Sequence, residues 1–570
     1  MSSIRSRAPS MLLPTKLGTS GRLGAAARRL SSGQPQAARD VEKRLRLPEY
    51  LLNVPPTQVT ALPNKFRVAS EHKHGETATV GVWIDAGSVW ETAENNGVAH
   101  FLEHLAFKGT KNRTKEQIEV EIENMGGQLN AYTSREQTVY HAHVFKKDVP
   151  KAVEIISDII QNSNLKEDDV ERERGVILRE MEEVESQTEE VIFDHLHSIA
   201  FQNTSLGYTI LGPEKNIKKI KREDLVSYVG KHYTAPRMVL SAAGAVDHDE
   251  LVKLAEKHFS GLSSETNVDY SNREKLFDFT GSMVQVRDTS IPLVHTTVAA
   301  KSVGWSDPDY FTFLVLQQLV GSWDRSLGGA KNLSSNLAET FATEELAHSL
   351  MSFNTCYHET GLFGAYFVGE MERTSDAIFE VLREWVRIGS GVSEVEVERA
   401  KNKLKSTYLM QLDGTQAVAE DIGRQLLTLG RRMPAAEAFM RIDAIDAKKV
   451  REVAYTYLND VDVAVAASTL ASSPTTTFSE AGPTGTGSKP AERVPEPSPP
   501  ILHSPTSNHH HHHHHTTKLF APVHPSISQH NALSVLATAS FRFLPVHPKR
   551  RQLHGVYSVV AFVLPDTLQA

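Results

Sequence analysis

The chain of 570 residues has little cysteine and no long apolar run, and each absence excludes a class of structure. Because Cys356 is the single cysteine, neither an intrachain disulfide nor a cysteine-rich zinc site can form. No apolar stretch approaches the roughly 20 residues that a membrane-spanning helix requires, so the sequence predicts no transmembrane segment. The formal net charge of −8 argues against nucleic acid as the main partner. The composition is otherwise that of an ordinary globular protein, with 40% hydrophobic and 23% charged residues.

The N-terminal segment lacks acidic side chains altogether, since the first one is Asp40. It contains many arginines, serines and alanines, which is typical of a mitochondrial transit peptide. A basic tail without a targeting role has a related composition and is the alternative. The stretch "ARRLSSG" favours cleavage between Leu30 and Ser31. We therefore predict a transit peptide over 1–30, a linker over 31–54 and a location in the mitochondrial matrix.

From about residue 55 the sequence alternates between strand-like and helix-like patterns. The stretch "TATVGVWIDAGS" (77–88) is rich in valine, isoleucine and threonine, which predicts a strand. The next stretch, "NNGVAHFLEHLAFKGT" (95–110), has apolar residues at helical spacing and a terminating glycine, which predicts a helix. Residues 126–145 are typical of two strands with a polar turn, and residues 170–202 of one long helix with an acidic middle.

The second part of the chain repeats these patterns. Residues 294–322 have the same strand, glycine-containing loop and apolar helix as residues 80–109. The stretch "FNTCYHETGLFGAYFV" (353–368) resembles "AYTSREQTVYHAHV" (131–144). Such internal similarity indicates a duplication, so we predict an α+β fold of two homologous halves, each a mainly antiparallel sheet packed with helices. The predicted boundaries are 55–265 for the first half, 266–285 for the linker and 286–468 for the second half.

The C-terminal tail, 469–570, has a different composition. It begins with a stretch rich in serine, threonine, proline and glycine, which is followed by seven histidines, His509 to His515. A histidine tract can bind metal, but no surrounding structure is predicted that would orient these ligands. We expect this tail to be disordered, like the N-terminal extension, and assign the histidine run no role.

The segment "HFLEH" carries the strongest chemical signal in the chain. A helix places His100 and His104 one turn apart on the same face, with Glu103 beside them. Two histidines at this spacing can supply two of the three protein ligands of a catalytic zinc ion, and the order H-x-x-E-H is that of the inverzincins. Glu103 would then be the general base that takes a proton from water. The alternative is a helix that shows two histidines on one face by chance.

A third ligand has to come from elsewhere, and the acidic helical stretch offers several carboxylates. Spacing alone does not choose among four of them: Glu173, Glu180, Glu182 and Glu183. Glu173 and Glu180 lie seven positions apart and therefore on one helix face, but each is by default a solvated charge. Between residues 167 and 194 the chain has twelve acidic and three basic side chains. Such a surface suits an arginine-rich, acid-poor ligand.

Five stretches of the sequence share one resemblance. They are "GVAHFLEHLAFKGT", "GGQLNAYTSREQT", "RERGVILREMEEVE", "DHLHSIAFQNTSLGYTILGP" and "LAHSLMSFNTCYHETGLFG". Together they resemble the pitrilysin-type zinc peptidases, and among these the β subunits of the mitochondrial processing peptidases, over about residues 55–468. This resemblance implies an endopeptidase that removes presequences from imported matrix proteins and cuts near an arginine two residues before the bond.

The resemblance also implies the roles of the residues in the site. One zinc ion per chain would be held by His100, His104 and Glu180. Glu103 would be the general base, and Glu173 would support the site without binding the metal directly.

The same resemblance implies how a presequence binds. Phe107 matches an aromatic residue that lines the pocket just after the cut. Asn130 and Ala131 match an edge strand on which an extended presequence docks by strand addition. Glu190 and Asp194 match the carboxylate pair that holds the substrate arginine. We therefore expect arginine-rich presequence peptides as substrates.

The chain also departs from this family. The family's glycine-rich loop belongs to the α subunit, and no segment here matches it, so we expect a heterodimer with an α subunit. The family's final segments are replaced by the unrelated tail 469–570. One alternative is a structural core-1 subunit of the cytochrome bc1 complex at the inner membrane, or a protein with both roles. Another is a zinc-binding scaffold without peptidase activity, which the intact H-x-x-E-H pattern disfavours.

Overall fold

The structure is a computed structural model, and it describes the following residues: 51, 54–266, 268, 277–287, 292–328 and 333–469. The predicted transit peptide, most of the linker after it and the C-terminal tail with its histidine run lie outside these residues. Within the described part of the chain, no helix has both the length and the apolar character needed to cross a membrane.

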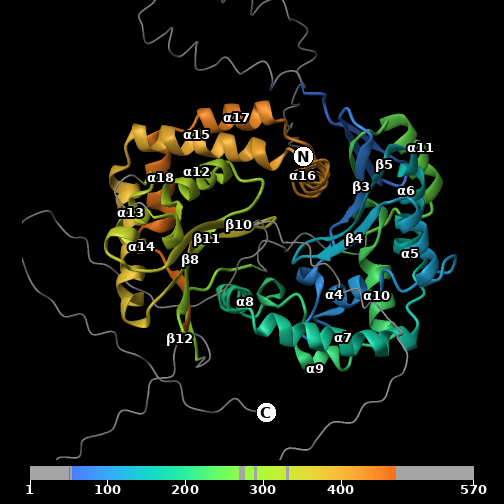
Figure 1. Cartoon of the computed structure of the whole chain (residues 1–570), viewed down its shortest axis with the longest axis horizontal. Helices are drawn as coiled ribbons and strands as arrows, with labels where there is room; N and C mark the ends of the chain where they lie inside the picture. Colours follow the sequence, from blue (N-terminus) through green and yellow to red (C-terminus); the bar gives the residue numbers. More distant parts are fainter. Residues whose placement is uncertain are drawn as a thin grey trace, which may run out of the picture.

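Two six-stranded sheets form the framework of the molecule (Figure 1). The first has the order β1-β2-β6-β3-β5-β4, with β1 (Gln58–Ala61), β2 (Arg67–His72), β3 (Thr77–Ile84), β4 (Gln128–Thr133), β5 (Thr138–Phe145) and β6 (Met238–Gly244). The second has the order β7-β12-β8-β11-β10-β9, with β7 (Met283–Arg287), β8 (Val294–Val303), β9 (Ser322–Asp324), β10 (Ser349–Cys356), β11 (Thr360–Gly369) and β12 (Val463–Thr469). Among the described strands, the β2–β6 and β7–β12 pairs are parallel and the other pairs are antiparallel. The predicted fold class is therefore confirmed.

Helices surround both sheets. In the first part of the chain they are α4 (Val98–Leu105), α5 (Lys115–Asn124), α6 (Val149–Asn162), α7 (Glu167–Glu185), α8 (Thr188–Ala200), α9 (Glu214–Ile217), α10 (Arg222–His232) and α11 (His248–Phe259). In the second part they are α12 (Tyr310–Val320), α13 (Asn336–Thr343), α14 (Thr374–Gly391), α15 (Glu394–Gln411), α16 (Thr415–Thr428), α17 (Ala435–Asp443) and α18 (Ala447–Leu458).

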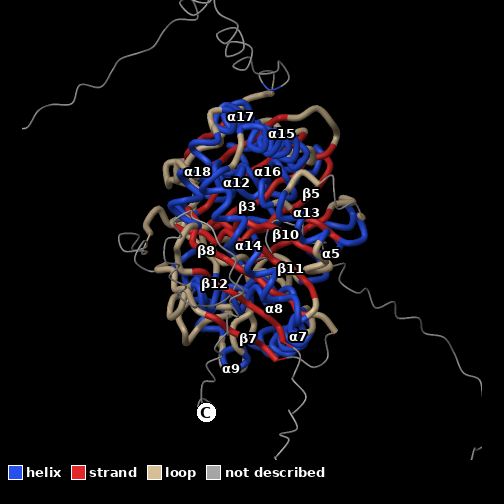
Figure 2. The backbone as a smooth tube through the Cα atoms, turned by 90° about the vertical axis from the view of Figure 1, so that its left-hand side faces the viewer, coloured by secondary structure: helices blue, strands red, loops and turns tan. Residues whose placement is uncertain are grey.

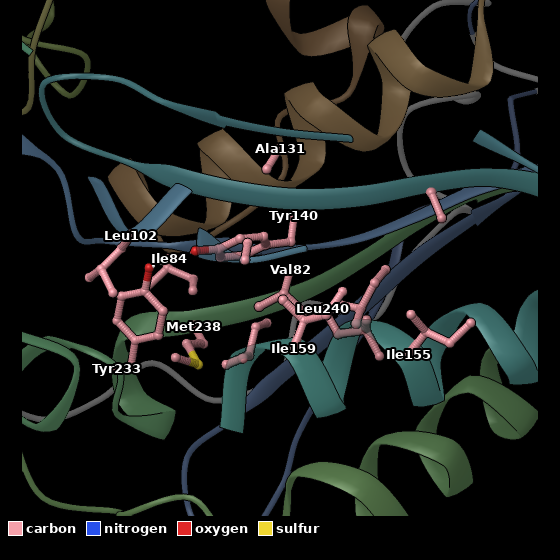
Figure 3. Packing of buried hydrophobic residues seen from close by; sticks show 14 of the residues in the cluster. Val82, Ile84, Leu102, Ala131, Tyr140, Ile155, Ile159, Tyr233, Met238 and Leu240 are labelled. Atoms are coloured by element: carbon pink, nitrogen blue, oxygen red, sulfur yellow. Dashed lines mark hydrogen bonds between the residues drawn. The ribbon is translucent and has the colours of Figure 1, made fainter. Parts of the chain in front are cut away.

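One face of the first sheet packs against helices that follow its own strands. Apolar residues of α6 recur at three- and four-residue spacing, which gives this helix one continuous buried face. In Figure 3, Ile155 and Ile159 of α6 lie against the strands that carry Val82 and Leu240, and all four are buried in one cluster. Fully burying one such side chain is worth about 1.5–3 kcal/mol. This layer fixes the sheet from which the site is built.

The opposite face of each sheet is covered by a helix from the other half. Helix α16 packs on the first sheet, where Ile422 contacts the cluster around Trp83. Helix α8 packs on the second sheet, where the rings of Phe193 and Tyr366 lie 5.3 Å apart. Figures 1 and 2 show α16 beside β3 and α8 beside β12. Each half therefore contributes one helix that packs on the sheet of the other half.

This exchange changes one predicted element. The expected single helix over 170–202 is wrong, because the chain leaves the helix at Ser186 and Gln187 and forms α7 and α8 separately. Helix α7 packs against α4 of the first half, whereas α8 turns to the second sheet. One straight helix could not reach both.

The predicted similarity of the two halves extends to their hairpin turns. The turn between β4 and β5 and the turn between β10 and β11 meet, since His358 N donates to Glu136 Oε1 at 2.9 Å. At Gly87, after β3, an added Cβ would collide with the carbonyl of Ser134 in the first turn. At Gly304, after β8, it would collide with the carbonyl of His358 in the second turn. Both halves thus need a glycine at the equivalent place, which is the duplicated loop expected from the sequence.

Candidate metal centre

The buried carboxylate of Glu91 caps the N-terminus of helix α4, which carries the H-x-x-E-H residues. Gly97 precedes the helix with φ of 105°, in the left-handed region that favours glycine. Glu91 accepts hydrogen bonds from the N–H groups of Gly97 and Ala99, at 2.9 and 2.7 Å, and from Asn96 Nδ2 at 2.8 Å. These bonds satisfy amide groups that have no partner within the helix. Burial raises the pKa of Glu91 to about 7, although the hydrogen bonds oppose this shift.

Three predicted ligands converge where α4 meets α7. The rings of His100 and His104 have centroids 4.7 Å apart. Glu180 reaches them from α7, with Oε2 2.9 Å from Nε2 of His104 and Oε1 3.7 Å from Nε2 of His100. The donor atoms of the three side chains all lie within 4.8 Å of one another. Glu182 and Glu183, which spacing had also left open, are exposed.

The chemistry of this group fits a divalent cation. At 3.7 Å, His100 Nε2 and Glu180 Oε1 are too far apart for a hydrogen bond. The other ring nitrogen, Nδ1 of His100, is buried without a hydrogen-bond partner among the described residues. A buried imidazole without good partners is costly, whereas two imidazoles and one carboxylate are the donors that zinc takes in catalytic sites.

Glu173 lies on the other side of His104. Its Oε2 is 3.5 Å from His104 Nδ1, and its Oε1 is 2.7 Å from Lys108 Nζ. This carboxylate therefore bridges a candidate ligand and a cation, in the manner of groups that orient metal-binding histidines. Lys108 was not predicted from the sequence, because it lies beyond the end of α4 and acts through a contact with α7.

The surrounding carboxylates make this place strongly negative. Burial lowers the pKa of His104, but hydrogen bonds to Glu173 and Glu180 outweigh burial and raise it to about 9, with a further contribution from the charge of Glu103. Glu103 itself is half-buried on α4 beside His104. The same negative charges would favour a bound metal cation.

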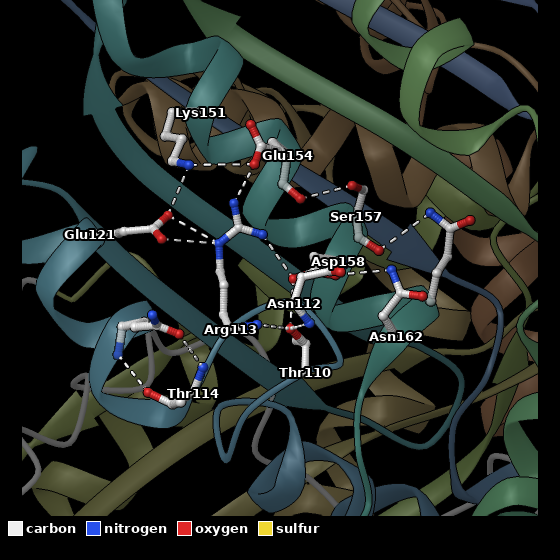
Figure 4. Close-up of polar contacts among 12 residues, drawn as sticks. Thr110, Asn112, Arg113, Thr114, Glu121, Lys151, Glu154, Ser157, Asp158 and Asn162 are labelled. Atoms are coloured by element: carbon white, nitrogen blue, oxygen red, sulfur yellow. Dashed lines mark hydrogen bonds and ion pairs between the residues drawn. The ribbon is translucent and has the colours of Figure 1, made fainter.

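The loop after α4 is tied to α6 by a half-buried arginine, Arg113 (Figure 4). Arg113 Nη1 lies 2.8 Å from Asp158 Oδ2, and Nε lies 3.0 Å from Glu121 Oε2. Arg113 also pairs with Glu154. Thr110 Oγ1 donates to Asp158 at 2.7 Å. This network fixes the segment that carries Phe107, which is half-buried and packs against the first core.

Strand β4, which carries Asn130 and Ala131, is the open edge of the first sheet. Ser134 N donates to Gln137 O at 2.7 Å, and the register pairs Ala131 with Tyr140. Because antiparallel pairs alternate, the backbone groups of Ala131 point to the open side of the strand. Its N–H donates there to Asn130 Oδ1 at 2.9 Å. The strand can therefore accept another extended chain.

The predicted arginine-binding pair lies on α8. Glu190 and Asp194 are four residues apart, so they share one face of this helix, and both are partly buried. Burial raises the pKa of Glu190, and the charges of Asp194 and Glu189 raise it further. Asp194 already has a partner, since its Oδ1 lies 2.7 Å from Nη2 of Arg135. Arg135 was not predicted from the sequence, because no spacing rule connects a hairpin turn with a helix that follows much later in the chain.

Two protein-family models match the chain. The insulinase family (peptidase family M16) matches residues 67–214, which contain α4 and α7. The chain belongs to the M16 peptidases. The peptidase M16 inactive domain matches residues 219–404, in agreement with the apolar helix that stands in the second half where the first has H-x-x-E-H. Membership makes the chain a metallopeptidase, which implies a metal, and His100, His104 and Glu180 form a group that could hold one.

Comparison with curated relatives shows to which group within the M16 family the chain is similar. The chain is 55% identical to the mitochondrial-processing peptidase subunit beta of Rattus norvegicus, over 74% of this chain and 86% of that protein. It is 53% identical to the protein of the same name from Lentinula edodes, over 72% and 90%. The probable subunit beta from Arabidopsis thaliana is 51% identical, over 73% and 79%. This M16 peptidase therefore falls within the group of the processing-peptidase β subunits.

A solved structure shares the fold. One chain of "Complex III2 from Candida albicans, Inz-5 bound" superposes with a TM-score of 0.64 at 25% sequence identity. The superposition covers 72% of this chain and 96% of that chain.

Proposed function

We propose that this chain is the zinc-binding, catalytic β subunit of a heterodimeric peptidase that removes presequences from proteins imported into the mitochondrial matrix. The observation that carries the proposal is the convergence of His100, His104 and Glu180 at the junction of α4 and α7. The names of relatives more than 50% identical to the chain support the presequence as the substrate class.

Each residue of the site then has a defined task. The imidazoles of His100 and His104 and the carboxylate of Glu180 hold the zinc ion, and Glu173 orients His104. Bound zinc supplies Lewis acidity, which makes water a nucleophile at neutral pH. Glu103 takes the proton from the attacking water and delivers it to the leaving amine.

The substrate docks in two ways. Its backbone pairs with the open edge of β4, where Ala131 offers its carbonyl and where its N–H exchanges the bond to Asn130 Oδ1 for a substrate carbonyl. Its arginine, two residues before the cut, binds Glu190 and Asp194 through charge-assisted hydrogen bonds. Phe107 lines the pocket on the other side of the scissile bond.

The partner is an α subunit that supplies the glycine-rich loop, for which this chain has no counterpart. The named relatives are subunits of a processing peptidase, which supports a second chain in the active complex. The arginine-rich, acid-free N-terminal segment supports import into the matrix.

The test compares zinc content with presequence cleavage, both measured on the complex with an α subunit. We expect His100→Ala and Glu180→Gln to lose zinc and activity together. Glu103→Gln should keep its zinc and lose about 10²–10⁴-fold in cleavage rate, the usual contribution of a general base. Glu182→Gln, an exposed neighbour on α7, is the matched control and should change neither quantity. Retained cleavage with lost zinc in Glu103→Gln would overturn the assignment of roles.

A second function is supported by the likeness to a chain of Complex III2. In that role the chain would be a structural core subunit of the cytochrome bc1 complex, alone or in addition to cleaving presequences. Purification under mild detergent separates the two: a β subunit of a free peptidase elutes with its α subunit and without cytochrome.

A further inference from the structure

Arg135 is a buried cation that faces the proposed arginine-binding pair. Its side chain is 9% exposed, against 31% for Asp194, and the two are joined by the 2.7 Å contact between Nη2 and Oδ1. Arg135 lies in the β4–β5 turn, directly after the strand on which the substrate would dock. The resting protein thus places an arginine of its own against the carboxylate meant for a substrate arginine.

The position of Arg135 is fixed from several sides. Its carbonyl accepts from Val89 N at 2.8 Å, and the neighbouring Glu136 accepts from His358 N of the second half at 2.9 Å. Tyr357 of the second half is hydrogen-bonded to His197 of α8, which lies beside this turn. Because backbone and neighbours are both held, Arg135 cannot leave as a mobile counter-ion would.

Asp194 uses one oxygen for this contact and keeps the other. Only Oδ1 is engaged with Arg135 among the described residues, and the partial exposure of the side chain leaves Oδ2 open to a ligand. A carboxylate can accept up to about four hydrogen bonds. Arg135 therefore holds Asp194 in one rotamer, and Asp194 can still accept hydrogen bonds from a substrate arginine.

The charge of Arg135 also acts on Glu190. Burial raises the pKa of Glu190, the charges of Asp194 and Glu189 raise it further, and the charge of Arg135 lowers it. Burial lowers the pKa of His197, assisted by Arg135, and raises that of Tyr357, so both are neutral near pH 7. Arg135 is accordingly the cation from a neighbouring element that offsets the crowding of like charges on α8.

We propose that Arg135 is a positioning residue for substrate specificity: it orients Asp194 and offsets the repulsion between the carboxylates of Glu190 and Asp194, so that the pair is in place when a substrate arginine arrives. This inference rests on the proposed presequence cleavage. It also gives the second half a task, since its β10–β11 turn anchors the turn that carries Arg135. The half without metal-type ligands thereby helps to select the substrate.

The structure favours this positioning role over the alternative, in which Arg135 competes with the substrate arginine for Asp194. A competing arginine would have to move out for the substrate, and its removal would then strengthen binding. Arg135 is more deeply buried than Asp194 and is tethered through its backbone, so its removal should weaken binding instead. The two roles predict changes in KM of opposite sign.

The test uses the complex with an α subunit and two matched presequence peptides, one with arginine at the recognised position and one with alanine there. Arg135→Gln should raise KM for the arginine peptide by about tenfold, the size of one charge-assisted hydrogen bond. Its kcat should stay nearly unchanged, and the acid limb of kcat/KM should move to higher pH, because the charge of Arg135 lowers the pKa of Glu190 and its loss lets that carboxylate protonate more readily. The alanine peptide should be little affected.

Two further variants complete the experiment. Arg135→Lys keeps the charge and should recover most of the loss in KM for the arginine peptide. Arg135→Gln should add little to the effect of Asp194→Asn on that KM, because both changes act through one contact. A lower KM in Arg135→Gln, or an equal loss for both peptides, overturns the inference. If the native complex itself does not prefer the arginine peptide, or if Asp194→Asn leaves that preference intact, the proposed arginine recognition fails, and this inference fails with it.

Discussion

At the scale of single residues, the carboxylate of Glu91 determines how stably the metal-binding helix begins. Its pKa of about 7 in the folded protein exceeds the ordinary value of 4.5, because burial disfavours the charged form more than three hydrogen bonds favour it. Between these pH values the folded state binds more protons than the unfolded state. The contribution of Glu91 to stability is therefore fully present below pH 4.5 and is lost as the pH rises through about 7.

We predict that Glu91→Gln lowers the thermal midpoint at pH 5, since an amide cannot accept hydrogen bonds from all three donors. Glutamine does not titrate, so the difference in the free energy of unfolding between the variant and the unmodified protein should shrink by up to about 3 kcal/mol as the pH is raised to 8. The difference in thermal midpoint should shrink with it. Glu94→Gln is the matched control, because Glu94 is exposed three residues away. Thermal unfolding at several pH values measures both variants. A deficit that grows with pH would contradict the assignment.

The sequence revealed the residues of the site that obey a spacing rule and missed those that do not. His100, Glu103 and His104 fall within one helical turn, so their common face follows from the helix alone. Lys108 and Arg135 act through contacts with distant helices, and no local pattern encodes such contacts. The choice of Glu180 rested on a resemblance, and its proximity to both histidines is a tertiary fact.

At the scale of elements, helix α16 lies close to the first sheet because Gly423 has no side chain. An added Cβ would collide with the indole of Trp83, whose Nε1 donates to Glu420 at 3.0 Å. We predict that Gly423→Ala destabilises the protein by about 1–3 kcal/mol, the usual cost of overpacking. Gly230, exposed in α10 with nothing within 4 Å of an added Cβ, is the matched control. Alanine there should stabilise by about 0.4–1 kcal/mol. Equal effects in denaturant unfolding would refute the packing argument.

Element types were predictable where one face of the element is apolar. The hairpin expected over 126–145 is present as β4 and β5, because alternation and a polar turn are local signals. The division between α7 and α8 was not predictable, because helical periodicity continues on both sides of Ser186 and Gln187. The reason for the break is a second packing partner, which only the folded chain supplies.

At the scale of the whole molecule, the two halves are not independent packing units. Periodicity marks a residue as buried but does not say which sheet covers it, so the sequence predicted two homologous halves without showing how they pack together. The structure adds two shared cores, one under α16 and one under α8. The hairpin turns that bear Arg135 and His358 lie at the same junction, so substrate selection and the union of the halves depend on one region.

The final prediction is that the first half cannot fold stably alone. Without α16, the buried side chains of Trp83, Val139 and Val239 would lose their cover. Each is worth about 1.5–3 kcal/mol, so the loss is comparable with the 5–15 kcal/mol that keeps a typical domain folded. The fragment 54–266 should therefore unfold without a cooperative transition, and co-expression with 277–469 should restore one. A sharp transition of the lone fragment at the temperature of the full chain would show that the exchanged helices contribute little.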